Sequence, residues 1–258
     1  MTYHNKAIAA VTSVLIVAMI MTTPLSAFAD SVHSAPRIKL KEGTSSNWSG
    51  YASVSNISSP ASNYVKTVQG SWTIPTLTCG SSTTYSSAWV GIDGYSDNSV
   101  EQIGTEQDCS NGAQQNYAWF EMYPHPSFKI TGIAVHAGDV FNAKVAYVGN
   151  SKFQLSITDA TTGKSYSNTF KAKAQRSSAE WVVEAPYSGG VLPLANFGTM
   201  NFTNAQFTDS SGNAIAIDGK GTGTYDQITM HDPNGGNSTP SALTDSSAAS
   251  SFSVTYSP

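Results

Sequence analysis

The sequence predicts an all-β protein, folded as an antiparallel sandwich or barrel. Ser, Thr and Asn total 80 of the 258 residues, whereas charged residues make up only 12%. This composition disfavours long surface helices and favours short strands joined by turns. Apolar and polar residues alternate with period two in several segments, and turn signals follow at short intervals. Many short strands without βαβ alternation are typical of two packed antiparallel sheets.

The clearest alternation predicts individual strands. It covers residues 67–74, 140–147 and 153–158, each typical of a half-buried strand. Turn signals lie at residues 148–151, 161–164, 209–213 and 233–237. No linker divides the chain after residue 46, so we expect one sandwich domain over residues 46–258.

The N-terminal segment is typical of export. Residues 1–6 carry positive charge, residues 7–21 form an apolar run, and Ala27–Ala29 offer a small-x-small cleavage site. The run is short for a membrane span, so residues 1–29 are predicted to be a signal peptide. Residues 30–45 are predicted to be a short exposed leader or propeptide remnant. We therefore expect a secreted, extracellular protein that has no membrane attachment after cleavage.

Two cysteines, Cys79 and Cys109, are present. In an exported chain an even pair without a CxxC motif predicts a disulfide. Closing a loop of about 30 residues stabilises a protein by about 3 kcal/mol in the chain-entropy model.

Several function classes are disfavoured by the sequence. The formal net charge is −4 without blocks of like charge, so a nucleic-acid partner is not expected. No G-x-S-x-G elbow and no phosphate-binding glycine loop occur. His125, His136 and His231 lack zinc-ligand spacing. We expect neither a metal nor a cofactor.

Carboxylates and aromatic residues share strand faces. Alternation places Tyr117, Trp119, Glu121 and Tyr123 on one face of a predicted strand. On another strand, Glu180 and Glu184 share a face with Val182, opposite Trp181 and Val183. Such surfaces suit a binding site better than plain solvent exposure.

These segments occur together with others in a recognisable order. The motifs are residues 47–51 (NWSGY), 87–94 (SAWVGIDG), 101–104 (EQIG), 119–124 (WFEMYP) and 179–184 (AEWVVE). The chain thereby resembles the glutamic peptidases, or eqolisins, and is similar to their prokaryotic branch over nearly the whole mature chain. The resemblance implies a concanavalin A-like (lectin-like) sandwich of two antiparallel sheets with a concave active-site face.

The resemblance also implies site residues. It places a catalytic Gln–Glu dyad on Gln102 and Glu184. The residues expected around the substrate are Trp89, Asp93, Trp119, Glu121, Tyr123 and Glu180. Glu180 and Glu184 lie on the same strand face, and only the family register assigns the base to Glu184. Glu101 is expected to point to the face opposite Gln102.

The implied activity is that of a secreted, acid-acting endopeptidase, a monomer with polypeptide substrates. A carboxylate takes a proton from a water while an amide donates to the developing oxyanion. A glutamate of ordinary pKa, about 4.3, is ionised in mildly acidic medium.

Two other functions suit a lectin-like sandwich: a glycoside hydrolase and a non-catalytic carbohydrate-binding module. Glu180 and Glu184 are the candidate carboxylates of the former. Along one strand their Cα atoms lie roughly 13 Å apart, which exceeds the separation of about 5.5 Å in retaining glycosidases.

Overall fold

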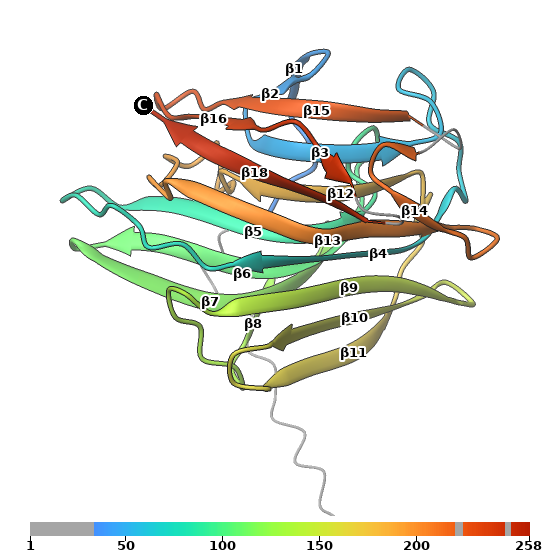
Figure 1. The fold of residues 1–258 in the computed structure, drawn as a ribbon, viewed down its shortest axis with the longest axis horizontal. Helices are drawn as coiled ribbons and strands as arrows, with labels where there is room; N and C mark the ends of the chain where they lie inside the picture. The colour runs from blue at the N-terminus through green and yellow to red at the C-terminus, as the bar shows by residue number, and fades with distance from the viewer. Residues whose placement is uncertain (1–33, 220–223, 246–248) are drawn as a thin grey trace, which may run out of the picture.

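A computed structural model describes residues 34–219, 224–245 and 249–258, and the predicted signal peptide lies outside the described residues. The regular elements of this part are all β-strands (Figure 1). They are β1 (Lys39–Lys41), β2 (Thr44–Ser45), β3 (Trp48–Val54), β4 (Val65–Thr73), β5 (Thr84–Ile92), β6 (Val100–Ser110), β7 (Ala113–Tyr123), β8 (Phe128–Ile130), β9 (Val140–Gly149), β10 (Lys152–Asp159), β11 (Ser165–Lys171), β12 (Ser178–Glu184), β13 (Thr199–Asp209), β14 (Ala214–Ala216), β15 (Thr224–His231), β16 (Asn237–Pro240), β17 (Thr244–Asp245) and β18 (Ser250–Ser257). None of the described segments forms a helix that is long and apolar enough to cross a membrane.

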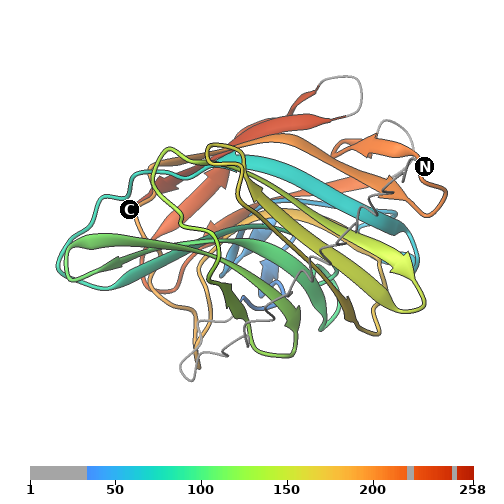
Figure 2. The same cartoon turned by 90° about the horizontal axis from the view of Figure 1, so that it is seen from below.

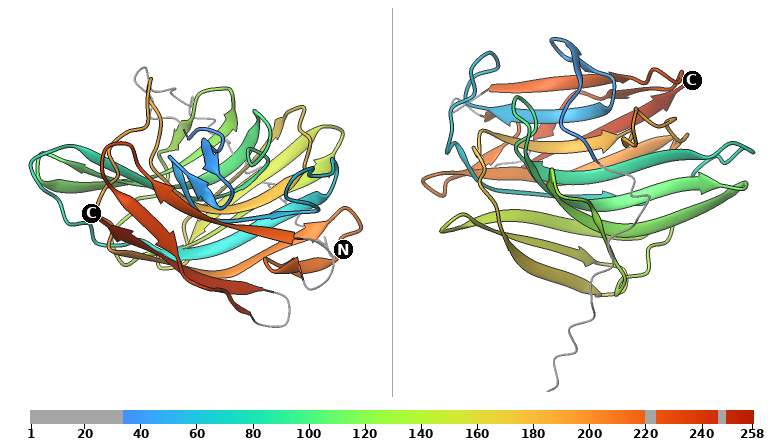
Figure 3. Two further views of the ribbon diagram at one scale, coloured as in Figure 1. Left: turned by 90° about the horizontal axis from the view of Figure 1, so that it is seen from above. Right: turned by 180° about the vertical axis from the view of Figure 1, so that it is seen from behind.

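The strands form two layers. The first sheet has the order β15-β3-β12-β5-β6-β7-β8. The second has the order β11-β10-β9-β4-β13-β18-β16. Figure 1 views the molecule from the side of the second sheet, and the right panel of Figure 3 from the side of the first. Neighbours within these sheets are antiparallel, whereas the short β2 pairs in parallel with β15. Because β15 also pairs with β16, the layers are joined along one edge.

The main core lies between the two layers. Figure 2 shows these layers from a second direction. The first sheet contributes buried side chains such as Trp181, Val90 and Ile103, and the second contributes Trp72 and Phe202. Trp181 Nε1 donates a hydrogen bond of 2.7 Å across the interface to the carbonyl oxygen of Gln69. The all-β sandwich predicted from the sequence is confirmed.

The predicted alternation corresponds to real strands. The three segments predicted above fall on β4, β9 and β10. A tight hairpin joins β9 to β10 at the predicted turn, where Asn150 and Ser151 have φ values of 53° and 55°. Asn tolerates this left-handed conformation better than most residues, which explains its use at the turn.

The predicted disulfide joins Cys79 to Cys109, whose Cα atoms lie 5.4 Å apart. It ties the β4–β5 connection to the end of β6. We expect the double variant Cys79→Ala/Cys109→Ala to lose about 3 kcal/mol of unfolding free energy, because the open chain regains loop entropy. Urea titration measures this as a lower midpoint. An unchanged midpoint would mean that strand pairing alone restrains this loop.

The leader is not exposed throughout, contrary to the expectation from sequence. Lys39–Lys41 are exposed on β1, but Ser34, Ala35 and Arg37 are buried. Alternation and composition cannot reveal this, because the contacts that bury these residues come from β3, β12 and β15, far along the chain.

Candidate active site

A second apolar cluster covers the outer face of the first sheet, the face turned away from the main core. Its members include Trp48, Trp89, Trp119 and Val182. Alternation explains the grouping, since Val182 lies between the core residues Trp181 and Val183. Val182 pairs with Trp89, which pairs with Gly104, which pairs with Trp119. The three tryptophans therefore line one face.

Two glycines leave room for the indole of Trp89. A Cβ atom at Gly91 would lie 2.8 Å from Trp89 Cζ3, and one at Gly104 would lie 2.5 Å from Trp89 Cβ. Both distances are shorter than van der Waals contact allows. Glycine at these positions fixes the indole against the sheet with its Nε1 toward β12.

Glu184 ends β12 on this outer face and is fully buried. Its Oε1 accepts hydrogen bonds from the backbone N–H of Ala35 (2.8 Å) and from Asn47 Nδ2 (3.3 Å). Its Oε2 accepts one from Trp89 Nε1 (2.9 Å). Burial raises the pKa of Glu184 well above its usual range, although the hydrogen bonds from Ala35 and Trp89 oppose the shift. The expectation of an ordinary pKa does not hold for this covered carboxyl.

Gln102 lies on β6, where it pairs with Gly91 of β5 on one side and with Glu121 of β7 on the other. It is fully buried on the outer face, and its Nε2 donates a hydrogen bond of 2.8 Å to Glu121 Oε2. This contact fixes the orientation of the side-chain amide. Glu101, the preceding residue, pairs with Ile92 of the main core, so it points to the opposite face as predicted.

Glu180 and Glu184 share the outer face as predicted, but they lie at different positions along β12. Glu180 pairs with Gly91 and is thus level with Gln102, whereas Glu184 pairs with Ser87. Glu180 is also fully buried, and neither of its carboxyl oxygens accepts a well-formed hydrogen bond from a described residue. Burial raises its pKa well above the usual range, and the nearby Ser178 hydroxyl opposes the shift. The two glutamates thus differ in their donors, since several well-formed hydrogen bonds hold Glu184 and none from the described residues holds Glu180.

Other predicted residues occupy distinct positions on this side. Trp119 Nε1 donates to Ser87 Oγ at 3.0 Å, and Tyr123 lies half-buried at the end of β7. Asp93 follows β5 with a φ of 73° and accepts hydrogen bonds from the backbone N–H groups of Arg176 and Ser177, both at 2.7 Å. Burial, and then Asp97, raise the pKa of Asp93 to about 6. Asp93 thus anchors the loop before β12.

Two further carboxyls lie on the same face of β6. Glu106 pairs with Ser87 and is therefore level with Glu184. Burial raises the pKa of Glu106 well above its usual range, and raises that of Asp108 to about 7. The outer face is therefore rich in carboxyls that favour the protonated form.

The sequence did not assign several residues that contact this site. Trp48 and Asn47 belong to the first of the five motifs, but no role followed from their spacing. No pattern in the sequence marked Asp226 or Tyr95 as residues of the site. Asp226 of β15 and Glu180 of β12 both pair with Ala52 of β3. Their alignment across the sheet therefore depends on the pairing of these three strands.

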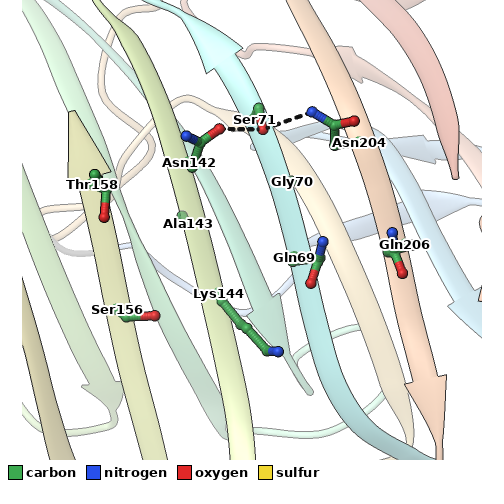
Figure 4. A pocket seen from close by; sticks show the side chains of 10 residues that line it. All are labelled: Gln69, Gly70, Ser71, Asn142, Ala143, Lys144, Ser156, Thr158, Asn204 and Gln206. Carbon is green, nitrogen blue, oxygen red and sulfur yellow. Dashed lines mark hydrogen bonds between the residues drawn. The ribbon is translucent and has the colours of Figure 1, made fainter. Parts of the chain in front are cut away.

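A separate groove of about 310 Å³ opens on the outer face of the second sheet (Figure 4). Ser71 Oγ donates to Asn142 Oδ1 (2.6 Å) and accepts from Asn204 Nδ2 (3.3 Å). The groove is lined by Gln69, Gly70, Ser71, Asn142, Ala143, Lys144, Ser156, Thr158, Asn204 and Gln206. This lining contains no carboxylate and lies on the other sheet from Gln102 and Glu184.

Comparisons with known proteins agree with this geometry. The model of the Peptidase A4 family matches residues 46–257. Aspergillopepsin-2 of Aspergillus niger is 30% identical over 199 residues, 67% of this chain and 68% of its own. Scytalidopepsin B of Scytalidium lignicola is 29% identical over 196 residues, 70% of this chain and 71% of its own.

Solved structures show the same fold. The crystal structure of aspergilloglutamic peptidase from Aspergillus niger has a TM-score of 0.56, with 27% identity over 67% of this chain and 99% of that one. Scytalido-glutamic peptidase with a transition state analog inhibitor has a TM-score of 0.66, with 24% identity over 82% of this chain and 98% of that one. The fold and these relatives define a peptidase. More particularly, the chain belongs to the Peptidase A4 family, the glutamic peptidases, and is a glutamic endopeptidase.

Proposed function

We propose that Gln102 and Glu184 form the catalytic dyad of a secreted, acid-acting endopeptidase that cleaves polypeptides. One observation carries the proposal most directly. A carboxyl group fixed by three hydrogen-bond donors and a side-chain amide oriented by Glu121 lie on the same outer face, on either side of the Trp89 strand. Orienting both groups before substrate binds is what acyl transfer to water requires.

In this mechanism Glu184 accepts a proton from a water molecule, whose oxygen attacks the scissile carbonyl carbon. Gln102 Nε2 donates a hydrogen bond to the carbonyl oxygen as it becomes negative. Glu184 then returns the proton to the leaving nitrogen, and the C–N bond breaks. Glu121 positions the amide of Gln102. Trp89, Trp119, Tyr123, Asp93 and Glu180 are proposed to surround the substrate.

The ionisation of Glu184 limits the pH range in which the proposed mechanism can operate. Glu184 must be ionised to act as a base; burial favours its neutral form, whereas the hydrogen bond from the backbone N–H of Ala35 favours its charged form. Access of water to this face removes part of that burial and lowers the pKa of Glu184. Export is supported by the N-terminal sequence and the disulfide. A glycosidase or a carbohydrate-binding module is not favoured, since the named relatives are peptidases.

Gln102→Ala tests the proposal. We expect kcat on denatured casein at acidic pH to fall by about 10² to 10³, because one oxyanion donor is lost. The matched control is Gln206→Ala on the second sheet, which should leave kcat unchanged. Retention of parental kcat by a folded Gln102→Ala protein would remove Gln102 from the mechanism.

Gln102→Glu adds a pH signature to the same test. A carboxyl group donates a hydrogen bond only while it is protonated. This variant should keep some activity at low pH and lose it as pH rises through the ionisation of the new carboxyl.

A further inference from the structure

A second pocket, of about 240 Å³, lies apart from the proposed active site. It opens where three connections meet, namely the β3–β4 loop, the β9–β10 hairpin and the segment from β11 to β12. The last of these crosses from the second sheet to the first (Figure 1). None of the lining residues belongs to the face that carries Gln102 and Glu184.

One part of the lining is apolar. Phe153 is fully buried, and the centre of its ring lies 5.3 Å from that of Tyr147. Tyr147, Ala172 and Ala174 are partly buried against the main core. Such a surface favours an apolar group of a ligand, because binding removes that group from water.

The other part of the lining is polar and positively charged. Arg176 and Lys173 are its cations, Asn63 and Ser151 are its neutral polar residues, and no lining residue is a carboxylate. Neither cation forms an ion pair with a carboxylate of the described residues. An anion in this pocket would therefore meet two positive charges without repulsion from an acidic residue of the lining.

The guanidinium group of Arg176 is held in place before a ligand binds. Its carbon lies 3.9 Å from the centre of the Tyr147 ring. Nη1 donates to the carbonyl oxygen of Val65 at 3.3 Å, and Nη2 donates to Asn63 Oδ1. Further N–H donors of the guanidinium are left for a ligand. A planar cation that is already oriented matches the two oxygens of a carboxylate and loses little entropy on binding.

The backbone of Arg176 is also fixed. Its φ of 54° lies in the left-handed region, which bulky residues rarely adopt. Its N–H donates to Asp93 Oδ2 at 2.7 Å, and its carbonyl oxygen accepts a hydrogen bond of 2.9 Å from Val65 N. The surrounding structure thus maintains an unfavourable conformation at the residue that carries the oriented cation, as is common at ligand sites.

We propose that this pocket binds the C-terminal residue of a peptide, with its carboxylate on the two cations and an apolar side chain against the two aromatic rings. The enzyme's own activity supplies such ligands, because each peptide bond that it hydrolyses leaves a new C-terminal carboxylate. A volume of about 240 Å³ is below the range of about 300–1,000 Å³ that is typical for drug-sized ligands, so the pocket admits one residue rather than a longer segment. The inference is independent of the roles proposed for Gln102 and Glu184.

Isothermal titration calorimetry on the purified secreted protein tests the site, with N-acetylphenylalanine as the probe. The parent should bind this acid at least about tenfold more tightly than N-acetylphenylalaninamide, because the amide lacks the charge that Arg176 meets. Arg176→Gln should remove most of this difference and leave the affinity for the amide nearly unchanged. Equal affinities of the parent for the acid and the amide would overturn the proposal, as would parental affinity for the acid in a folded Arg176→Gln protein.

Lys171→Gln is the matched control, because Lys171 is an exposed cation of β11 that does not line the pocket. This variant should keep the parental affinity for the acid. Lys173→Gln serves should Arg176→Gln fold poorly, since Lys173 is exposed. Its affinity for the acid should fall by about threefold or more, as expected when one nearby charge is removed from a partly exposed site. An unchanged affinity in Lys173→Gln would contradict a site built from two cations.

Two further comparisons decide what binds and where it binds. 3-Phenylpropionate has the ring and the carboxylate of the probe but lacks its amide group, which Asn63 and Ser151 can hydrogen-bond. It should bind about threefold or more weakly than the probe. Equal or tighter binding would assign the pocket to free aromatic acids instead of peptide ends. Binding that is lost in Gln102→Ala and kept in Arg176→Gln would locate the acid on the outer face of the first sheet and refute the proposed pocket.

Discussion

Glu184→Gln is expected to lower turnover of denatured casein by at least about 10² to 10⁴, the usual contribution of a general base. The variant keeps the size of the side chain, but an amide cannot accept the proton of the attacking water. Its NH₂ group would also replace one of the two carboxyl oxygens and would then face either Trp89 Nε1 or the backbone N–H of Ala35, both of which are donors. Both effects act on the same step.

Glu180→Gln is the matched control for this prediction. Both glutamates are fully buried on the outer face of β12, yet no well-formed hydrogen bond from the described residues holds the Glu180 carboxyl. We expect this variant to keep a measurable fraction of parental kcat. Steady-state kinetics at several acidic pH values, together with circular dichroism to verify folding, measure the difference. The reverse ranking would move the base to Glu180, which is level with Gln102.

The stability of the folded protein is expected to depend strongly on pH. We expect the free energy of unfolding to fall by several kcal/mol as pH rises from about 4 to about 8. Burial raises the pKa of six carboxyls in the folded state, and these are Asp93, Glu101, Glu106, Asp108, Glu180 and Glu184. In the unfolded chain the same groups titrate near about 4.

The number of protons bound in the folded and unfolded states determines the direction of this pH dependence. Between the unfolded and folded pKa values the folded protein holds more protons than the unfolded chain, so stability decreases as pH rises. The contribution is complete below about pH 4 and is lost as pH passes each folded pKa, about 6 for Asp93 and about 7 for Asp108. A tenfold difference in proton affinity between the two states corresponds to about 1.4 kcal/mol of stability for each group.

Urea midpoints at pH 4, 6 and 8 measure this slope. Glu101→Gln provides an internal control, because Glu101 points away from Gln102 and its buried oxygens have no described hydrogen-bond partner. The variant should be more stable than the parent at pH 8 and nearly equal at pH 4. A parent whose stability rises with pH would show that these carboxyls are charged and paired in the folded protein.

Local patterns in the sequence predicted much of this molecule. Alternation placed Trp119, Glu121 and Tyr123 on one face of a strand, and the register confirms that they share it. It also separated Glu184 from Trp181, which packs in the main core. Such predictions succeed because the direction of a strand side chain depends only on residue parity.

The rest depended on which strands become neighbours. Arg37 and Asp226 are separated by 189 residues, and Ala35 and Glu184 by 149. Nothing in a single sequence shows that β15, β3 and β12 lie side by side, so an exposed leader was the natural expectation. The pKa of Glu184 was wrongly expected to be ordinary for the same reason, since residues from other parts of the chain, such as Ala35 and Asn47, lie against its carboxyl group.

The register of β12 limits how this enzyme can diverge. Its odd-numbered residues from Ala179 to Val183 fill the main core, while its even-numbered residues form the proposed site. Inserting or deleting one residue within this strand would exchange the two sets, placing carboxyls between the sheets and an indole on the outer face. Changes in substrate preference within the lineage should therefore arise by substitution on this strand, and by changes of length only in the loops around it.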